Sequence, residues 1–259
     1  MESLGFIGMG NMAQALAQGF ISSGALAGEH VFAYAPHQDK LKKTAERIGF
    51  QPVASLADLA AAADTLVMAC KPYQIEGVVA ELGDALSGKA LVSIAAGWDF
   101  AHYEKVLPPD VRFQFVMPNT PAMVREGVLL FEEKTSLEKA ERQELMDLFS
   151  TVGVVEVVPS RLMAAAGTVT GCGPAFVDLM IEAYADAAVK YGVPREQAYA
   201  LVAQMVKGSA ALALETKEQP GVLKDAVCSP GGTTIRGVCS LEEDGFRAAC
   251  IHSIDAILE

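Results

Sequence analysis

The chain has 259 residues, of which 51% are hydrophobic, and a formal net charge of −12 at pH 7. This length suffices for one large or two modest domains with real cores, and the apolar content excludes intrinsic disorder. The negative charge disfavours nucleic acid and anionic membranes as partners, although helix N-termini and local cations can still bind a small anion.

Signals for membrane insertion, secretion and metal binding are weak. Asp64, Lys71, Lys89 and Asp99 interrupt the most apolar stretches, so no run reaches the roughly 18–20 residues that a membrane helix needs. No Lys or Arg precedes Lys40, so the basic n-region that a signal peptide needs is missing. The five cysteines are scattered without CxxC spacing, which indicates reduced thiols and no metal site. We expect a cytoplasmic protein.

The first part of the chain alternates short apolar runs with helical patterns. The expected strands are 4–7, 31–34, 65–69, 90–94, 112–116, 128–131 and 154–158. The expected helices are 11–22, 39–48, 56–63, 75–86, 100–106 and 137–151. Strand–helix–strand alternation at this spacing predicts a doubly wound, mainly parallel sheet with helices on both faces. We assign this α/β domain to residues 1–158.

Residues 159–259 carry helical patterns and no convincing strand. Prolines suited to a first helical turn predict helices 174–190 and 194–216, and Gly192 falls just past the end of the first. A shorter helix is expected over 221–227, and one or two over 233–257. The long helices are apolar around much of their circumference, and a domain of this size cannot bury them all. We therefore expect an all-α domain that forms a homodimer.

A dinucleotide fingerprint follows the first expected strand. Gly8, Gly10 and Ala13 form the pattern GxGxxA. Gly8 permits a tight turn, Gly10 lets the backbone approach a pyrophosphate, and Ala13 keeps the helix close to the strand. An ordinary tight turn is the alternative interpretation. Because a second strand follows near residue 31, we predict dinucleotide binding.

The end of the second expected strand favours NADPH over NADH. An NAD enzyme usually places an acid there, about 20 residues past the glycines, to bind the ribose 2′-hydroxyl. Tyr34-Ala35-Pro36-His37 contains no acid, and Asp39 falls in the next helix. His37 and Lys40 could offer charge to a 2′-phosphate, or could be solvated surface groups. We expect NADPH as the cofactor, with NADH less favoured.

Three further loops lie at the carboxyl ends of expected strands, where ligands bind in such sheets. They are Ala69–Pro72, Ala95–Gly97 and Met117–Pro121, and the two prolines of the last make it a stiff wall for a nicotinamide ring. The expected cofactor-binding residues are Ile7, Gly8, Gly10, Asn11, Met12, Ala35, Pro36, His37, Lys40, Ser55, Ala69, Cys70, Lys71, Pro72, Ala95, Gly97, Met117 and Asn119.

A glycine-rich turn, Ser229-Pro230-Gly231-Gly232-Thr233-Thr234, lies near the end of the chain. Pro230 fixes φ, the glycines allow backbone angles closed to other residues, and Thr233 can cap the helix that follows. Such a turn aims several N–H groups at one point and can bind a small anion such as a carboxylate. Plain chain punctuation is the alternative interpretation.

With these motifs the chain resembles the pyrroline-5-carboxylate reductase family over essentially its whole length. The resemblance rests on segments 6–12, 71–72, 93–97, 117–121, 124–127, 220–225 and 228–235, the last two being the most specific. One departure is Gly171-Cys172-Gly173, where the family commonly has serine in the centre. Cysteine keeps the size of serine but is a poorer hydrogen-bond partner.

The resemblance implies NAD(P)H-dependent reduction of 1-pyrroline-5-carboxylate to L-proline by hydride transfer to the C=N carbon, the last step of proline biosynthesis. It implies that the substrate-binding residues are Ser229, Gly231, Gly232, Thr233, Thr234 and Asn119. The Thr234 hydroxyl, near the ring nitrogen, would be the catalytic group. The family also implies that this turn reaches the cofactor of the partner subunit, in a homodimer or a larger assembly of dimers.

Two other functions stay open at this point. A related two-domain NADP-dependent 3-hydroxyacid dehydrogenase would carry a catalytic lysine a few residues after Gly171–Gly173, but no lysine occurs there before Lys190. A non-catalytic NADPH-binding sensor would need no carboxylate-binding turn, whereas the chain has an intact one at 229–234.

Overall fold

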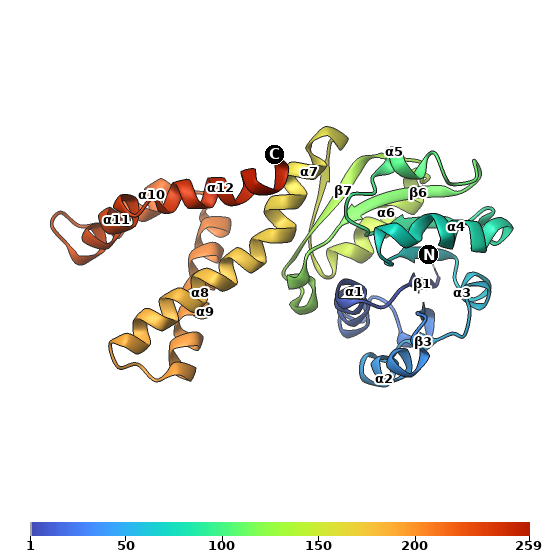
Figure 1. Ribbon diagram of the computed structural model, residues 1–259, viewed down its shortest axis with the longest axis horizontal. Coiled ribbons are helices and arrows are strands. Elements are labelled where there is room, and N and C mark those ends of the chain that lie inside the picture. Colours follow the sequence, from blue (N-terminus) through green and yellow to red (C-terminus); the bar gives the residue numbers. More distant parts are fainter. Residues whose placement is uncertain (1) are drawn as a thin grey trace. The chain divides into compact units, whose positions relative to one another are not determined.

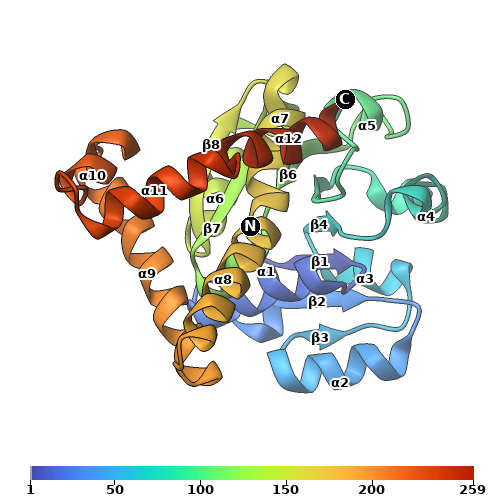
Figure 2. The ribbon, with the colours of Figure 1, turned by 60° about the vertical axis from the view of Figure 1, so that its left-hand side comes forward.

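The computed structural model describes residues 2–259, which form two compact units, one ending at Gly171 and one spanning Cys172–Glu259. The first unit is an α/β sheet domain and the second is entirely helical (Figures 1 and 2). The helical segment 160–171, expected in the second domain, packs with the first unit.

The first unit is built on one sheet with the strand order β3-β2-β1-β4-β5-β6-β7-β8. Neighbouring strands are parallel except for β6 and β7. The strands are β1 Leu4–Ile7, β2 Val31–Tyr34, β3 Gln51–Pro52, β4 Thr65–Met68, β5 Ala90–Ser93, β6 Arg112–Met117, β7 Gly127–Thr135 and β8 Gly153–Val158. The chain runs outward from β1 to β3 and then crosses back to β4, so the β1–β4 junction is a topological switch point.

Helices cover both faces of this sheet. They are α1 Asn11–Ser22, α2 Gln38–Ile48, α3 Leu56–Ala62, α4 Ile75–Leu82, α5 Phe100–Tyr103, α6 Lys139–Ser150 and α7 Met163–Gly167. Side chains of α1, α2 and α6 pack in one cluster of buried residues, and those of α3, α4 and α5 pack in another. The expected doubly wound, mainly parallel sheet is confirmed.

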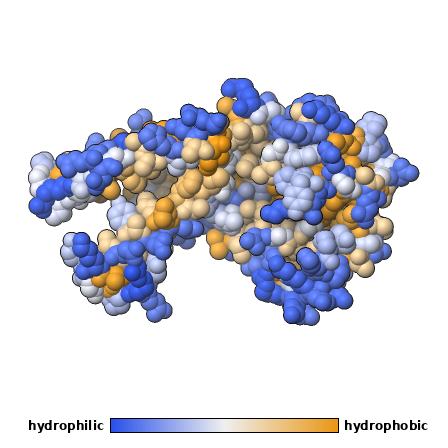
Figure 3. Space-filling view, viewed as in Figure 1, coloured by the Kyte–Doolittle hydropathy of each residue, from blue (hydrophilic) through white to orange (hydrophobic). Residues whose placement is uncertain are grey.

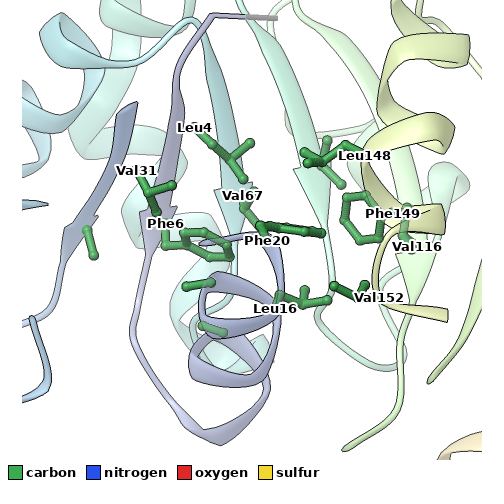
Figure 4. Close-up of a cluster of buried hydrophobic side chains, with 14 of the residues drawn as sticks. Leu4, Phe6, Leu16, Phe20, Val31, Val67, Val116, Leu148, Phe149 and Val152 are labelled. Atoms are coloured by element: carbon green, nitrogen blue, oxygen red, sulfur yellow. The ribbon is translucent and has the colours of Figure 1, made fainter. Parts of the chain in front are cut away.

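The two clusters draw on alternate residues of the same strands. In β1, Leu4 and Phe6 belong to the first cluster and Ile7 to the second, while in β4 Val67 faces the first and Met68 the second. Strands covered on both faces can be apolar throughout, which explains their unbroken hydrophobic runs. Figure 4 shows Phe6, Phe20 and Phe149 within the first cluster, and the rings of the latter two meet edge-on at 5.2 Å.

The sequence missed β3 and misplaced several element ends. Gln51–Pro52 pairs with β2 at the edge of the sheet, and both residues are exposed, so it has no apolar signature. The expected helix 75–86 ends as an α-helix at Leu82, because Gly83 takes φ 45° and a 3-10 turn follows.

The second unit consists of α8 Gly173–Lys190, α9 Arg195–Thr216, α10 Pro220–Ala226, α11 Thr233–Glu243 and α12 Phe246–Leu258. Helices α8 and α9 form a hairpin around a small cluster that contains Ala185, Ala198 and Val202. Gly192 turns the chain between them at φ 95°, as expected of a glycine just past a helix end. Few other side chains are buried within this unit alone, and hydrophobic residues lie on the face seen in Figure 3.

The expectation that no stretch is long and apolar enough for a membrane helix is wrong for residues 160–190. Residues 160–190 form a continuous helical run that is long and apolar enough to span a bilayer by length and composition. The sequence predicted a helix that starts at Pro174, with no helix before it. The structure instead continues through a π-helical turn, Thr168–Cys172. Pro174 has no N–H for the carbonyl of Thr170, and Asn119 Nδ2 donates to that oxygen at 3.0 Å.

Candidate functional site

A cavity of about 630 Å³ opens at the carboxyl ends of β1, β2, β4 and β5, at the switch point of the sheet. It is lined by Ile7, Gly8, Met9, Gly10, Asn11, Met12, Ala13, Tyr34, Ala35, Pro36, His37, Lys40, Leu41, Thr44, Ala69, Cys70, Lys71, Pro72, Gln74, Val78, Ile94, Ala95 and Ala96. Open α/β sheets bind ligands at this position, and the volume suits a large cofactor.

The glycine loop after β1 has the geometry that a pyrophosphate needs. Gly8 takes φ 97°, and its N–H donates to Tyr34 O at 2.8 Å. A Cβ at Gly8 would lie 2.9 Å from Ala69 O, whereas a Cβ at Gly10 would meet no atom within 4 Å. The folded chain itself therefore does not require glycine at position 10. A ligand that lies against the backbone there would require it. The N-terminus of α1, which has no acidic residue in its first turn, lies at the same place.

The end of β2 presents basic side chains to the cavity and no carboxylate. His37 and Lys40 line it, as expected. Asp39 is in the first turn of α2 but does not line the cavity. The Gln38 side chain fixes this loop by donating to Ala35 O at 3.0 Å and Val53 O at 3.2 Å. The electrostatics here suit a phosphate on the ribose.

Ser55 does not line the cavity. Its hydroxyl caps α3, accepting from Asp58 N at 3.0 Å and donating to Asp58 Oδ2 at 2.7 Å. The folded chain thus gives Ser55 a local role as an N-cap, and a cofactor contact at this residue stays a prediction.

The loops after β4 and β5 form the other side of the cavity. Ala69, Cys70, Lys71 and Pro72 line it as expected, and Gln74 Oε1 accepts from Lys71 N at 3.1 Å. Burial raises the pKa of the Cys70 thiol, so this cysteine stays protonated and weakly nucleophilic.

The turn after β5 carries Ala95 and Gly97. Ala95 lines the cavity, whereas Gly97 does not and takes φ 80° within the turn. Behind this turn, burial raises the pKa of Tyr103, and a hydrogen bond to Ser93 opposes that shift. The phenol is therefore protonated and donates to Ser93 Oγ at 2.9 Å.

Met117 and Asn119, at the end of β6, are not among the lining residues of the cavity. Asn119 is 5% exposed, and both polar atoms of its side chain form hydrogen bonds within the chain. Its Oδ1 accepts from Val128 N at 2.9 Å, and its Nδ2 donates to Thr170 O. Met117 packs against α7, because a Cβ at Gly167 in that helix would clash with the Met117 Sδ. Within the folded chain Asn119 therefore holds the π-helical turn, and Met117 packs against the helix before it.

The glycine-rich turn lies in the second unit, between α10 and α11. Gly231 takes φ 68°, and Gly232 N donates to Ser229 O at 3.0 Å, which closes the turn. Gly232, and not Thr233 as expected, is the N-cap of α11, and no side chain caps this helix. The correction strengthens the anion-binding interpretation, because the first N–H groups of α11 and the hydroxyls of Thr233 and Thr234 are left exposed.

A second cavity, of about 320 Å³, lies at the amino ends of the strands. Glu2, Asp64, Glu141 and Glu144 line it together with Arg112, whose guanidinium is paired with Glu141 at 2.8 Å. Four carboxylates disfavour a phosphate-bearing ligand there. Over the described residues 2–259, no group of three His, Cys, Asp or Glu side chains could hold a metal ion.

Sequence reasoning missed several lining residues of the main cavity. They are Met9, Tyr34, Leu41, Thr44, Gln74, Val78 and Ile94. Two of them follow from helical spacing, since Thr44 lies four residues after Lys40 on α2 and Leu41 lies four residues after His37, the N-cap of that helix. Gln74 and Val78 carry no motif, and only the fold of the 3-10 turn Pro72–Gln74 and of α4 brings them to the cavity.

Comparisons with known proteins agree with this geometry. Residues 160–259 match the family described as pyrroline-5-carboxylate reductase dimerisation, and residues 3–97 match the family described as NADP oxidoreductase coenzyme F420-dependent. The chain is 42% identical to pyrroline-5-carboxylate reductase of Treponema pallidum over 99% of this chain and 98% of that one. It is 39% identical to the Escherichia coli enzyme over 100% of this chain and 96% of that one.

A solved structure shares the fold over the full chain. The Plasmodium falciparum pyrroline carboxylate reductase with NADP bound superposes with a TM-score of 0.90 at 32% identity, covering 99% of this chain and 96% of that one. The apolar helical run 160–190 falls within the region matched to the dimerisation family, so its hydrophobic surface belongs to a dimerisation domain. On these grounds the chain belongs to the pyrroline-5-carboxylate reductase family of NAD(P)H-dependent oxidoreductases.

Proposed function

We propose that this protein reduces 1-pyrroline-5-carboxylate to L-proline with NADPH, the last step of proline biosynthesis, in the cytoplasm. The observation that carries the proposal is the pairing of a dinucleotide-type cavity, open at Gly10, with an uncapped anion-binding turn at 229–234, in a chain similar over its full length to such reductases. NADH is the less favoured donor, because no carboxylate lines the cavity at the end of β2.

The residues around the cavity fit this dinucleotide. The loop Gly8–Gly10 and the first N–H groups of α1 would hold the pyrophosphate, because Gly10 leaves open space and the helix N-terminus favours negative charge. His37 and Lys40 would bind the 2′-phosphate. The loops Ala69–Pro72 and Ile94–Ala96 would flank the nicotinamide half. When bound, the reduced nicotinamide supplies the hydride.

Reduction of this substrate needs no strongly reactive group on the protein. A protonated C=N bond is already electrophilic at its carbon, so position and charge complementarity suffice for hydride transfer. We propose that the N–H groups of Gly231–Thr234, with Ser229, hold the substrate carboxylate. The Thr234 hydroxyl would lie near the ring nitrogen and orient the protonated imine.

We further propose that the substrate turn acts in the partner's active site. The division of labour would follow residues 1–158 for the cofactor and 159–259 for substrate binding and dimerisation. Asn119, proposed from the family as a binding residue, would act through its backbone, since its side chain is engaged elsewhere. The assembly would be a homodimer or a larger ring of dimers, without nucleic-acid or membrane partners.

The experiment that tests the proposal is a spectrophotometric assay of the purified protein with NADPH and 1-pyrroline-5-carboxylate. We expect substrate-dependent loss of NADPH absorbance and formation of proline. Parallel reactions with a 3-hydroxy acid and NADP⁺, and with NADPH alone, should show no turnover. Turnover of the hydroxy acid would reassign the protein to the dehydrogenases, and NADPH binding without any turnover would leave only a sensor.

A further inference from the structure

The turn Ala95–Trp98 is held from behind by buried polar groups that the reaction itself does not need. Ile94, Ala95 and Ala96 form part of the cavity wall on the side of β4 and β5. The turn is closed by Trp98 N donating to Ala95 O at 3.3 Å, with Gly97 at φ 80°. Ala95, Ala96 and Gly97 are small and present mainly backbone, so their own side chains do little to fix the position of the turn.

A serine and a tyrosine anchor the start of the turn. Ser93 Oγ accepts from Ala95 N at 3.2 Å and from the Tyr103 hydroxyl at 2.9 Å. Both Ser93 and Tyr103 are 0% exposed. The Tyr103 ring stacks on Phe113 at 4.3 Å and meets Trp98 edge-on at 5.4 Å. The hydroxyl is therefore fixed by packing on two sides and aims at the serine.

A glutamate anchors the end of the same segment. Glu132, on β7, is 1% exposed, and its Oε2 accepts from Phe100 N at 2.8 Å. The hydrogen bonds at Ala95 and Phe100 thus bracket the whole turn. The bond to Glu132 comes from a strand two places away in the sheet from β5, so the turn is tied to the sheet and not only to its own neighbours.

Buried polar groups cost stability unless they are satisfied, and within an apolar cluster a satisfied set fixes one backbone conformation. The surrounding cluster is apolar and contains Leu91, Phe113, Phe115 and Leu130. Apolar residues at positions 93, 103 and 132 could therefore pack there as well, so packing alone does not require the three polar side chains. We propose that Ser93, Tyr103 and Glu132 are positioning residues that set the wall of the nicotinamide half of the cofactor site. This inference rests on the proposed function, because it takes the dinucleotide as the ligand of the cavity.

The test compares two ligands on the same variants. NADPH spans both halves of the site, whereas adenosine 2′,5′-bisphosphate fills only the half near β2. We expect Tyr103→Phe and Glu132→Gln each to raise the Kd for NADPH several-fold and Ser93→Ala to raise it about tenfold, because Ser93→Ala strands two donors. The Kd for adenosine 2′,5′-bisphosphate should stay at the wild-type value in all three.

Ser136→Ala is the matched control. The Ser136 hydroxyl also accepts a backbone N–H, from Phe113 at 2.8 Å, but Ser136 does not line the cavity. Because Ser136 is exposed and Ser93 is buried, Ser136→Ala should lower the Tm less than Ser93→Ala does, and it should leave both Kd values unchanged.

Two results would overturn the proposal: unchanged NADPH affinity in folded Tyr103→Phe and Glu132→Gln, or equal weakening of both ligands. Wild-type protein that binds NADPH but does not reduce the imine would contradict the proposed function alone.

Discussion

At the scale of single residues, the two fingerprint glycines are needed for different reasons. Gly8 is required by the fold, since its φ is 97° and a Cβ would lie 2.9 Å from a backbone oxygen. Gly10 has φ −75°, which any residue can adopt, and open space around it. The need for glycine at position 10 comes from the ligand.

This difference predicts that alanine at position 10 weakens NADPH binding, whereas alanine at position 8 lowers the stability of the fold. Gly10→Ala should change the free energy of unfolding by no more than about 1 kcal/mol, the scale of an N-cap change, and should weaken NADPH binding at least about tenfold. Gly8→Ala should destabilise the fold by about 1–3 kcal/mol, because it forces strained backbone against Ala69. Urea denaturation and a fluorescence titration with NADPH measure the two quantities. Intact NADPH affinity in Gly10→Ala would mean that the pyrophosphate does not rest there.

Thr234 is the residue on which the proposed chemistry depends most. Thr234→Ala should lower kcat/KM at least about tenfold, or about 1.4 kcal/mol in transition-state stabilisation, because the imine loses its hydroxyl partner. Thr234→Ser keeps the hydroxyl and should recover most of the activity. Steady-state kinetics on both variants measure this, and wild-type rates in Thr234→Ala would remove the residue from the mechanism.

At the scale of elements, Asn119 joins β6, β7 and the π-helical turn. Asn119→Ala would remove the hydrogen bonds to Val128 N and Thr170 O, which are part-buried, at a cost of about 0.5–1.5 kcal/mol for each. Asn119→Asp keeps the acceptor for Val128 N but sets a carboxylate against the Thr170 carbonyl, so it should be no more stable than the alanine variant. Urea denaturation measures both. Free energies of unfolding equal to that of the wild type would show that the π-helical turn holds itself.

The pair Arg112–Glu141 links β6 to α6 and should make stability depend on pH. The hydrogen bond that the Arg112 guanidinium donates to Glu141 lowers the pKa of the Glu141 carboxyl in the folded state. Stability from a lowered carboxyl pKa is present at neutral pH and is lost as the pH falls through the folded pKa. Both side chains are about one-third exposed, so the contribution is about 1 kcal/mol or less.

The corresponding measurement is the free energy of unfolding of wild type and Glu141→Gln as the pH falls from neutrality to below about 4, the usual range of a glutamate pKa. The two curves should differ at neutral pH and converge in acid. A constant difference across this range would contradict a role for the ion pair.

Much of the sheet domain could be predicted because each buried strand is an apolar run with a turn signal behind it. The expected bounds of β1, β2 and α1 match the structure. The two-residue β3 has no such run. The helix 174–190 was predicted, but its continuation before Pro174 was not, because the Thr170 carbonyl that Pro174 cannot pair is bound by Asn119, a residue far away in the chain. The cavity residues that follow motifs were found, whereas Gln74 and Val78 depend on the path of α4.

At the scale of the whole molecule, the helical unit is incomplete as a single chain. Leu179, Leu201, Met205 and Leu212 each expose 48% or more of their surface. Exposed apolar area of this kind marks an interface, in agreement with the match of residues 160–259 to a dimerisation family. The cofactor cavity is lined only by residues of the sheet unit, so it can form without the substrate turn.

The central claim is that the turn of one chain completes the active site of its partner. Hybrid dimers that combine one Gly10→Ala chain with one Thr234→Ala chain, isolated through two different tags, test it directly. One of their two sites would join an intact cavity to an intact turn from the other chain. With NADPH and imine both kept well below their wild-type KM values, we predict that the hybrid regains about half of the wild-type activity while both parent variants stay below about a tenth. A hybrid no more active than its parents would contradict the claim, because each chain would then supply its own turn.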